Sequence, residues 1–450
     1  MTWMIDAGWK KCLCWAFIAL LAGCLGNTPG VLASEEKGVK VLTLDEALRI
    51  TLEQNKDIQK AREYRKTVEG RYMEERAAAL PQLQITGMIN HERDESLNAL
   101  FAGLFPLERQ TRTGEIGLSQ ALYTFGRIGA AIRAAKVGLA TAEDQLRIYR
   151  QAALRDVSAS FYDILLAKEL YTIAVQDLEQ KVRLLDEARR RYAAGVATEY
   201  DLLAAEVAVE NARPGVIRTE NLIRISQDKF RFLLGLEEQV DAMGTLGAPL
   251  TPSPQYEETL ETALRSRPEL ADLRKRVEIA KELVKIYDAG NMPRLDLKTG
   301  YGWRQLILGS LQGSGPEWTA GLYFTFPFFD GLRTQGKVVQ AKTDVVNLTI
   351  DEGKLKDSVT LQTRDAVNAF RESSEIVMAL SGTVKQAERL VIMAEKGYEY
   401  GVKTKLEVDD AQVNLNRAKG NLAKARRDYL VARVTLEWVK GTLEVNSVPE

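Results

Sequence analysis

Hydrophobic and polar residues alternate along four short segments of the chain, at residues 82–89, 115–122, 294–303 and 317–326. In the third segment, Leu295 and Leu297 fall on one face, whereas Asp296 falls on the other. A period of two predicts β-strands that have one apolar face and one polar face. Pro81 and Pro293 stand just before the first and third segments, where the start of a strand tolerates the missing N–H.

Long helical patterns occupy most of the chain between these segments. The first helix is predicted over residues 44–80, where Thr43 and Glu46 have the spacing of a capping box. Two further helices are predicted over residues 128–194 and 332–400, which contain no proline and little glycine. A helix of about 65 residues forms a rod of roughly 100 Å, a length typical of coiled coils or helical tubes.

Glycine and proline mark the places where these helices should end or bend. Gly195 and Gly401 follow the two longest helical patterns, and we expect the chain to turn back there in the left-handed conformation. Pro214 and Gly215 interrupt the helical pattern that follows the first of these turns. A proline inside a helix removes a hydrogen bond, so the sequence predicts a kink or a local break at this point.

The chain is an internal duplicate. Residues 46–58 align with residues 258–270 at an offset of 212 positions, and residues 192–206 align with residues 398–412 at an offset of 206. A collinear set of matches over both halves is a stronger signal than one repeated word. Each half reads helix, strand, strand, long helix, helix, so the fold class is mainly α with β. We therefore predict two structural repeats, at residues 42–240 and 256–443.

The first residues have the features of an export signal. Two lysines precede an apolar run that ends near residue 25, and this run is too short for a convincing membrane span. One interpretation is a secretory signal peptide over residues 1–33, with cleavage before Ser34. The other is a lipoprotein signal over residues 1–23, which would leave Cys24 as a lipidated first residue. Both interpretations predict an exported protein.

Composition and charge exclude several classes of function. The chain is 45% hydrophobic and 27% charged, and its formal net charge of −1 gives no basic field for nucleic acid. The only histidine is His91, and no His, Cys and carboxylate group has metal-ligand spacing. No phosphate-binding glycine loop occurs either. We therefore expect neither an enzyme nor a cofactor or metal site.

Four strands are too few to close a barrel across a membrane. Alternation by itself is also typical of an antiparallel sheet packed on a water-soluble core. Export, together with a polar face that mixes charges with glycines, favours strands that have lipid outside and water inside. An open strand edge in lipid leaves backbone groups unsatisfied. Three chains would supply twelve strands, and the same trimer would enclose a tube with its helices.

The duplicated motifs resemble the TolC family of outer-membrane efflux and secretion channels. The matching words are "ALRITLEQNKDI" with "TALRSRPEL", "LPQL" with "MPRL", "ALYTFGR" with "PFFDGLR", and "YAAGVATEYDLLAAE" with "YEYGVKTKLEVDDAQ". The resemblance covers about residues 42–443. It implies a homotrimer with a 12-stranded β-barrel in outer-membrane lipid and a long antiparallel α-helical barrel in the periplasm. It also implies docking to an inner-membrane pump through a periplasmic adaptor, with drugs, metals or proteins as cargo.

The resemblance also implies a gate at the periplasmic tip of the second repeat. The family's gate tyrosine falls on Tyr398 and its basic partner, an arginine in the best-known member, falls on Lys403. The family's two acidic ring positions fall on Glu407 and Asp410. Lysine keeps the charge of arginine but loses its two-pronged hydrogen bonding. The turn of the first repeat has no basic residue at Ala197.

A second class of function fits the long helices. A periplasmic coiled-coil adaptor or scaffold of an export complex would also be exported and rich in heptads. Such a protein would have no barrel strands, so the four alternating segments argue against it.

Overall fold

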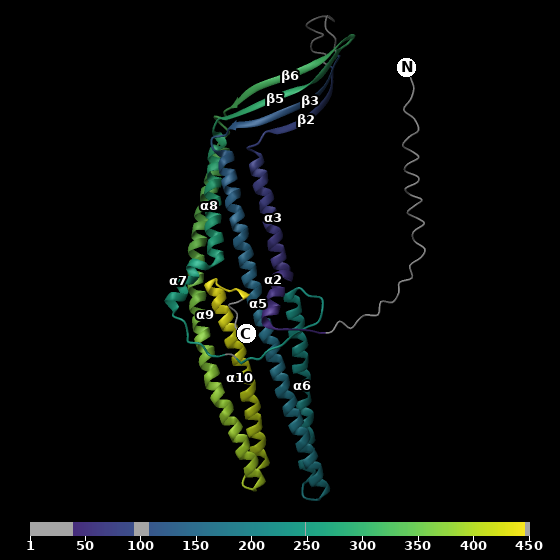
Figure 1. Cartoon of the computed structure of the whole chain (residues 1–450), viewed down its shortest axis with the longest axis vertical. Helices are drawn as coiled ribbons and strands as arrows, with labels where there is room; N and C mark the ends of the chain where they lie inside the picture. The colour runs from purple at the N-terminus through teal and green to yellow at the C-terminus, as the bar shows by residue number, and fades with distance from the viewer. Residues whose placement is uncertain (1–38, 94–107, 248, 446–450) are drawn as a thin grey trace, which may run out of the picture.

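The computed structural model describes residues 39–93, 108–247 and 249–445. The predicted signal peptide and Cys24 lie outside these residues. The described chain is elongated, with a sheet at one end and two long helical hairpins at the other (Figure 1). In the part of the chain that the structure describes, no helix combines the length and the apolar character needed to cross a membrane.

The sheet contains the four predicted strands in one antiparallel order. They are β2 (Gln82–Arg93), β3 (Glu108–Tyr123), β5 (Arg294–Leu308) and β6 (Leu311–Thr325), arranged β2-β3-β5-β6. Ile85 lies opposite Ile116, which lies opposite Tyr301, which in turn lies opposite Trp318. Paired residues share a face. The apolar faces predicted separately for the four strands therefore form one continuous apolar surface.

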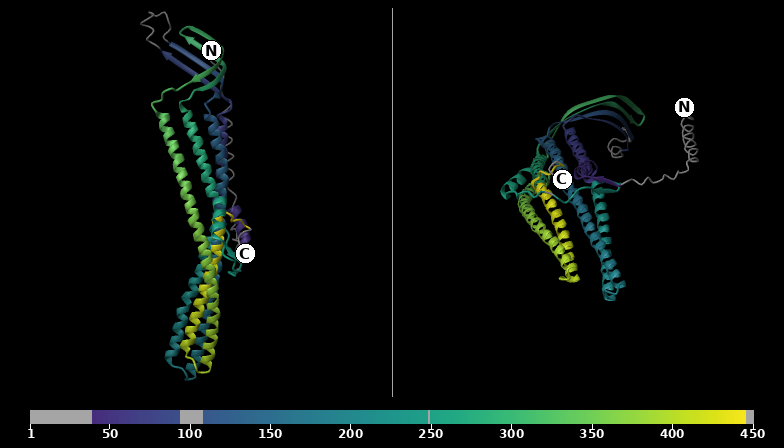
Figure 2. Two further views of the ribbon diagram at one scale, coloured as in Figure 1. Left: turned by 90° about the vertical axis from the view of Figure 1, so that its left-hand side faces the viewer. Right: turned by 60° about the horizontal axis from the view of Figure 1, so that its bottom comes forward.

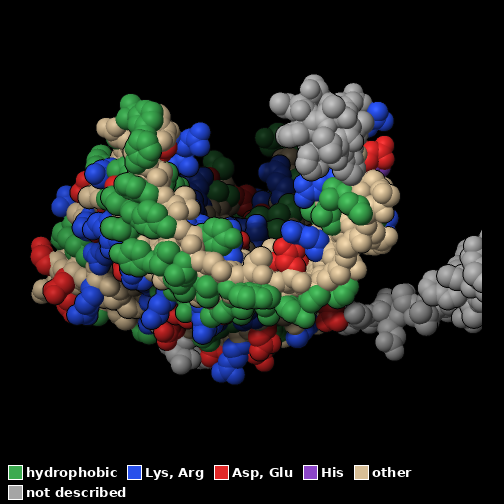
Figure 3. Space-filling model, turned by 90° about the horizontal axis from the view of Figure 1, so that it is seen from above, with side chains coloured by type: hydrophobic (Ala, Val, Ile, Leu, Met, Phe, Trp, Pro, Cys, Tyr) green, Lys and Arg blue, Asp and Glu red, His purple; other side chains and the backbone are tan. Residues whose placement is uncertain are grey.

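The opposite face of the sheet is polar and lines a hollow. The row next to the apolar one holds Thr86, Glu115, Gly302 and Glu317 in register. Seen from above, hydrophobic side chains follow the convex outer side, and charged side chains are visible in the hollow (Figure 3). A curved sheet that is apolar outside and polar inside is typical of part of a water-filled barrel.

Four long helices form two hairpins of equal dimensions. They are α5 (Arg127–Ala193), α6 (Glu199–Leu234), α9 (Arg333–Glu399) and α10 (Lys405–Lys440). The first helix of each hairpin has 67 residues and the second has 36. Gly195 and Gly401 turn the chain back, each with φ of 73°. The long helices and their left-handed turns are therefore confirmed, and the hairpins lie beside each other (Figure 2).

The prediction of one helix over residues 44–80 is wrong, because the chain breaks at Asn55. The two pieces are α2 (Leu44–Gln54), which starts with the predicted capping box, and α3 (Lys56–Ala77). The Asn55 side chain accepts hydrogen bonds from two backbone amides of α3, and its Nδ2 donates to the carbonyl of Leu233 at 2.7 Å. The second half breaks at the aligned position, between α7 (Tyr256–Ser266) and α8 (Pro268–Asp288). A short 3₁₀ turn, η1 (Ala289–Asn291), then leads into β5.

The end of each hairpin packs on the helix break of its own half. A Cβ atom at Gly235 would lie 2.5 Å from the carbonyl oxygen of Gln54, and one at Gly441 would lie 2.9 Å from the Cα of Arg267. Both glycines have positive φ, so both close approaches need glycine. Beside them, β1 (Lys40–Leu42) pairs with β4 (Val240–Ala242) in parallel over the largest hydrophobic core.

Of the kink or local break predicted at Pro214 and Gly215, the break does not occur, because α6 continues through both residues. Glu210, whose carbonyl loses its usual partner, is exposed, so water can satisfy that carbonyl. Buried residues on both sides of the proline, such as Val209 and Phe230, hold the helix in place. Packing along the hairpin therefore outweighs the local effect of the proline.

Candidate gate at the tip of the helices

The tips of the two hairpins are built in the same way. Thr198 starts α6 with a capping box closed by Asp201, and Thr404 starts α10 with one closed by Glu407. Each capping carboxylate accepts the backbone N–H of its threonine, at 2.9 Å in α6 and 2.8 Å in α10. The bond to the threonine lowers the pKa of Asp201. Both turns are therefore fixed locally, which gives the residues around them defined positions.

Tyr398 connects the two hairpins. Its ring packs beside the small apolar core between α9 and α10. Its hydroxyl accepts a hydrogen bond of 2.9 Å from Nη1 of Arg191, the third residue from the end of α5. The guanidinium carbon also lies 5.7 Å from the centre of the tyrosine ring. This pair joins the end of one repeat's long helix to the end of the other's.

Lys403 makes its contact within its own hairpin. Its Nζ donates to Oε1 of Glu407 at 2.5 Å, while the other carboxylate oxygen accepts from Thr404. The lysine bond, followed by the backbone bond from Thr404, lowers the pKa of Glu407 to about 2. Glu407 is therefore an anion throughout the physiological pH range. The structure thus brings Lys403 and Glu407 together and gives Tyr398 a different partner.

The two tips carry their basic residue in exchanged positions. At the 206-residue offset, Arg191 aligns with Gly397 and Ala197 aligns with Lys403. A Cβ atom on Gly397 would lie 2.4 Å from Cγ of Lys403. At the second tip, the side chain of Lys403 from the turn therefore occupies the space that a larger residue at position 397 would fill. The first tip has a helix arginine and no turn cation.

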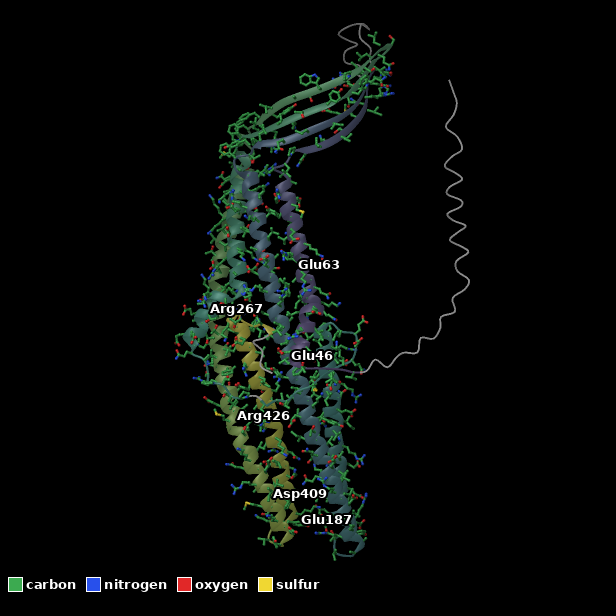
Figure 4. The ribbon with its side chains drawn as sticks, viewed as in Figure 1. Glu46, Glu63, Glu187, Arg267, Asp409 and Arg426 are labelled. Carbon is green, nitrogen blue, oxygen red and sulfur yellow. The ribbon has the colours of Figure 1, made fainter. Side chains whose placement is uncertain are left out.

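Two neighbouring aspartates differ in their surroundings. Asp410 is exposed on the first turns of α10. Asp409 is partly buried between the hairpins, and this burial raises its pKa despite the opposing charges of Lys405 and Lys181. Figure 4 shows Asp409 on α10 near Glu187 on α5 at the tip. Of the two, only Asp410 has the exposure expected of a residue that faces an aqueous pore.

A groove runs up from the tip between the hairpins. Its lower part is a pocket of about 200 Å³ that Arg191, Tyr398 and Asp409 help to line. Its upper part is a pocket of about 460 Å³ that is lined by apolar residues, including Leu184 and Leu406, and by charged residues, including Asp177 and Lys181. The groove shows that the hairpins touch only along part of their facing surfaces near the tip.

Polar contacts of α5 with the second hairpin recur along the seam. The three α5 members stand 14 positions apart, which is two heptads, so they lie on one face of the helix. The hydrogen-bond distances lie between 2.8 and 2.9 Å, apart from a second, shorter bond of 2.5 Å between Arg427 and Asp163. The contact farthest from the tip is an ion pair, which Lys229 of α6 joins. The three pairs are Asp163 with Arg427, Asp177 with Asn416, and Arg191 with Tyr398.

Sequence reasoning missed Arg191 as a member of this site. The run of three arginines before the first turn reads as a solvated helix face, and the partner tyrosine lies 207 positions away. The alignment of the two repeats could have indicated that Arg191 has a special role, because it aligns with a glycine, Gly397, at the other tip. Among the described residues, no group of three or more His, Cys, Asp or Glu side chains could hold a metal ion.

Comparisons with known proteins agree on one kind of molecule. The family model described as "Outer membrane efflux protein" matches residues 47–236 and 259–442. Outer membrane protein TolC of Vibrio cholerae is 24% identical over 386 residues, covering 83% of this chain and 84% of its own. Alkaline protease secretion protein AprF of Pseudomonas aeruginosa is 24% identical over 381 residues, covering 82% and 78%. The CmeC outer membrane channel of Campylobacter jejuni superposes with a TM-score of 0.79 at 15% identity, covering 89% and 85%.

Proposed function

This chain belongs to the outer membrane efflux protein family, and we propose on that basis that three copies of it share one channel. As a member of this family, the protein is an outer-membrane channel of an efflux or secretion system, with a large periplasmic portion. The observation that carries the three-copy proposal is the sheet, which has one apolar face and two free edges.

The edges of the sheet require partners. In the described part of the chain, β2 pairs only with β3, and β6 pairs only with β5. Backbone groups on a free edge inside lipid have no water to bond, so the edges must pair with other strands. Four strands cannot close a membrane barrel, for which about eight is the lower limit. Pairing β6 of one copy with β2 of the next closes twelve strands after three copies.

The helices also present unpartnered faces to a second copy. On α6, exposed apolar residues stand 3, 4, 10, 8 and 7 positions apart, spacings that place them on one side of the helix. On α9, the apolar residues Val346, Ile350 and Leu361 are exposed. Neighbouring copies in a ring would cover both faces at once. The apolar residues of the α6 stripe are Tyr200, Leu203, Val207, Ile217, Ile225 and Phe232.

The tip is proposed as the periplasmic gate. Tyr398 and Lys403 hold the α9–α10 hairpin in its closed position, the first through Arg191 and the second by bracing the turn through Glu407. Opening requires this hairpin to swing away from α5, which breaks the bond between Arg191 and Tyr398. Three copies of Glu407 and Asp410 would form an acidic ring that attracts cations to a narrow pore.

The partners proposed for this channel are a periplasmic adaptor and an inner-membrane pump. The channel has no energy source of its own, so the pump supplies the driving force. The relatives are named for efflux and for protease secretion. Either kind of system fits a duct that is filled with water, because a water-filled duct needs no specific substrate pocket.

The proposal is tested by the mass and the conductance of protein purified from outer membranes. We expect a particle of three chains by native mass spectrometry in detergent. In planar bilayers we expect discrete, cation-selective current steps. A monomer in the soluble fraction with no conductance would overturn the channel, and a channel of another copy number would overturn the twelve-stranded closure alone.

A further inference from the structure

An open groove follows one face of α5 below the sheet. Helices α3 and α8 both pack on α5 and form the two walls of this groove (Figure 1). The contact with α3 is close, since a Cβ atom on Gly138 would lie 3.5 Å from Cγ1 of Val68. The groove consists of two adjoining pockets of about 540 and 560 Å³, the second of which is nearer the sheet. The residues that line both pockets are Glu75, Ala131, Leu283 and Ile286.

The floor of the groove is long and mostly apolar. Successive α5 residues of the floor stand 3, 3, 1, 3, 3 and 4 positions apart, which keeps them on one side of the helix. The stretch from the first to the last of them is about 26 Å long, at 1.5 Å per residue. On α8, Ile279, Leu283 and Ile286 add larger apolar side chains to one wall. The α5 residues of the floor are Ile128, Ala131, Ala134, Ala135, Gly138, Thr141 and Gln145.

The groove faces the inside of the proposed duct. Four residues of the sheet line the pocket nearer to it, and each lies an even number of positions along its strand from the polar row that contains Glu115 and Glu317. Residues at even spacing share a face of the sheet. The groove therefore exposes Leu283 and Met292, which are 39% and 42% exposed, to the water of the duct. The four residues of the sheet are Gln82, Ala121, Arg294 and Thr325.

Charged side chains of both signs stand unpaired at the groove. Two of its arginines are held by aspartates, with Nε of Arg276 2.8 Å from Asp272 and Nε of Arg294 2.6 Å from Asp296. Among the residues that the structure describes, no hydrogen bond or ion pair engages the other four charged side chains of the lining. These four are Arg71, Glu74, Glu75 and Arg127, of which Glu75 and Arg127 both line the pocket nearer the sheet.

We infer that the groove binds a transported amphiphile that has one hydrocarbon chain and a zwitterionic head group with a phosphate and an ammonium group. The phosphate pairs with Arg127, because a guanidinium matches phosphate oxygens in charge and geometry. The ammonium group pairs with Glu75, and the hydrocarbon chain lies along the apolar floor on α5. The inference rests on the proposed sharing of one duct by three copies, and it names a class of cargo for that duct.

The charges of the groove favour this class over other amphiphiles. A head group with only a negative charge would lie beside the like charge of Glu75, and one with only a positive charge would lie beside that of Arg127. Like charges brought together lower the affinity, whereas a zwitterion finds a partner for each of its charges. Because the groove is open to water, the ion pairs add little binding energy, and burial of the hydrocarbon chain supplies most of it. The head group therefore sets the preference among amphiphiles of equal chain length.

Chemical protection of a single cysteine tests the groove. All three native cysteines lie in the first 24 residues, so either maturation route leaves no free thiol. Leu283→Cys places a thiol in the groove, and Lys281→Cys places one at an exposed position of the same helix outside the lining. Each channel is placed in lipid nanodiscs free of detergent, and its reaction rate with a charged, water-soluble maleimide is measured. The probe is dodecylphosphocholine below its micelle concentration. Dodecyl sulfate and dodecyltrimethylammonium are compared with it, because they have the same chain and one sign of charge.

We expect dodecylphosphocholine to protect position 283 and to leave position 281 unprotected. At four times the dissociation constant, mass action slows the reaction at position 283 about fivefold. The dissociation constants of the two singly charged amphiphiles should be at least about threefold higher. In the Leu283→Cys channel, Glu75→Gln and Arg127→Gln should each weaken the protection by dodecylphosphocholine. Arg76→Gln is the matched control, since Arg76 is exposed and lies outside the lining.

Three results would overturn the inference in different ways. Equal protection by the three amphiphiles would overturn the assignment of a zwitterionic head group. Equal slowing at positions 281 and 283 would overturn the groove as a binding site. In both cases, a three-chain particle with normal conductance would leave the proposed channel intact. A soluble monomer without conductance would overturn the proposed channel, and the inference with it.

Discussion

Nη1 of Arg191 lies 2.9 Å from the hydroxyl of Tyr398, and this bond joins the last turn of α5 to the last turn of α9. The two helices come from different repeats. Among the described residues, this exposed hydrogen bond links the two hairpins at the tip, and two further polar contacts follow along the same face of α5.

Removing the tyrosine hydroxyl should favour the open gate. Tyr398→Phe deletes the bond from Arg191 and keeps the ring packed between α9 and α10. The loss is about 1 kcal/mol for each chain, because the bond is exposed. We expect a higher open probability in single-channel recordings. Tyr192→Phe is the matched control, since Tyr192 is the aligned residue of the first tip. Equal effects from both variants would remove Tyr398 from the gate.

Acid should destabilise the turn between α9 and α10 only at very low pH. The pKa of Glu407 is lowered to about 2, chiefly by the hydrogen bond from Lys403. A lowered pKa means that the stabilisation is complete above the ordinary glutamate range and is lost as the pH falls towards 2. We expect conductance to be insensitive to this group between about pH 5 and 8. In Lys403→Met, the transition should move up towards the ordinary range, as measured by conductance against pH. A wild-type transition near pH 5 that the variant leaves in place would contradict this assignment.

A methyl group on Gly397 should displace Lys403. The added Cβ would meet Cγ of Lys403 at 2.4 Å, near the root of that side chain. We expect Gly397→Ala to break the bond to Glu407 and to increase leak current. Gly382→Ala in the same helix meets nothing within 4 Å and should stabilise the protein by roughly 0.5–1 kcal/mol. If both variants raise the unfolding temperature equally, Lys403 does not prevent a side chain at position 397.

The helix end at Gly235 should tolerate no side chain. Gly235→Ala places a methyl group 2.5 Å from the Gln54 carbonyl at positive φ, so it should lower the free energy of unfolding by at least about 1 kcal/mol. The control is Gly215→Ala, in the interior of α6, where nothing lies within 4 Å. Thermal unfolding in detergent measures both. A neutral Gly235→Ala would show that the helix break at Asn55 can shift without cost.

Local patterns predicted the parts of the fold that are set locally. The alternation in each strand identified its apolar face without knowledge of its neighbours, and the register then placed Ile85, Ile116 and Tyr301 side by side. Gly195 and Gly401 were recognisable because a left-handed turn needs glycine. In each case, the residues that determine the local structure lie within a few positions of the pattern that predicts it.

The errors concern contacts between distant parts of the chain. From the sequence, Asn55 looks like an ordinary helix residue. It ends a helix because its side chain also donates a hydrogen bond to the carbonyl of Leu233, 178 positions away. Likewise, nothing near Arg191 in the sequence indicates Tyr398 as its partner. The gate positions came from a resemblance, and their roles stay predictions until conductance is measured.

The free edges of β2 and β6 have a consequence for inheritance. A chain whose β6 edge cannot pair still offers a normal β2 edge, so it can join a ring and prevent that ring from closing. If normal and defective chains are made in equal amounts, only about one three-copy ring in eight contains normal chains alone. A defect in β6 should therefore inhibit transport even when normal chains are present, which is a dominant effect. Loss of the whole chain should impair transport only when no normal copy is made, which is a recessive effect.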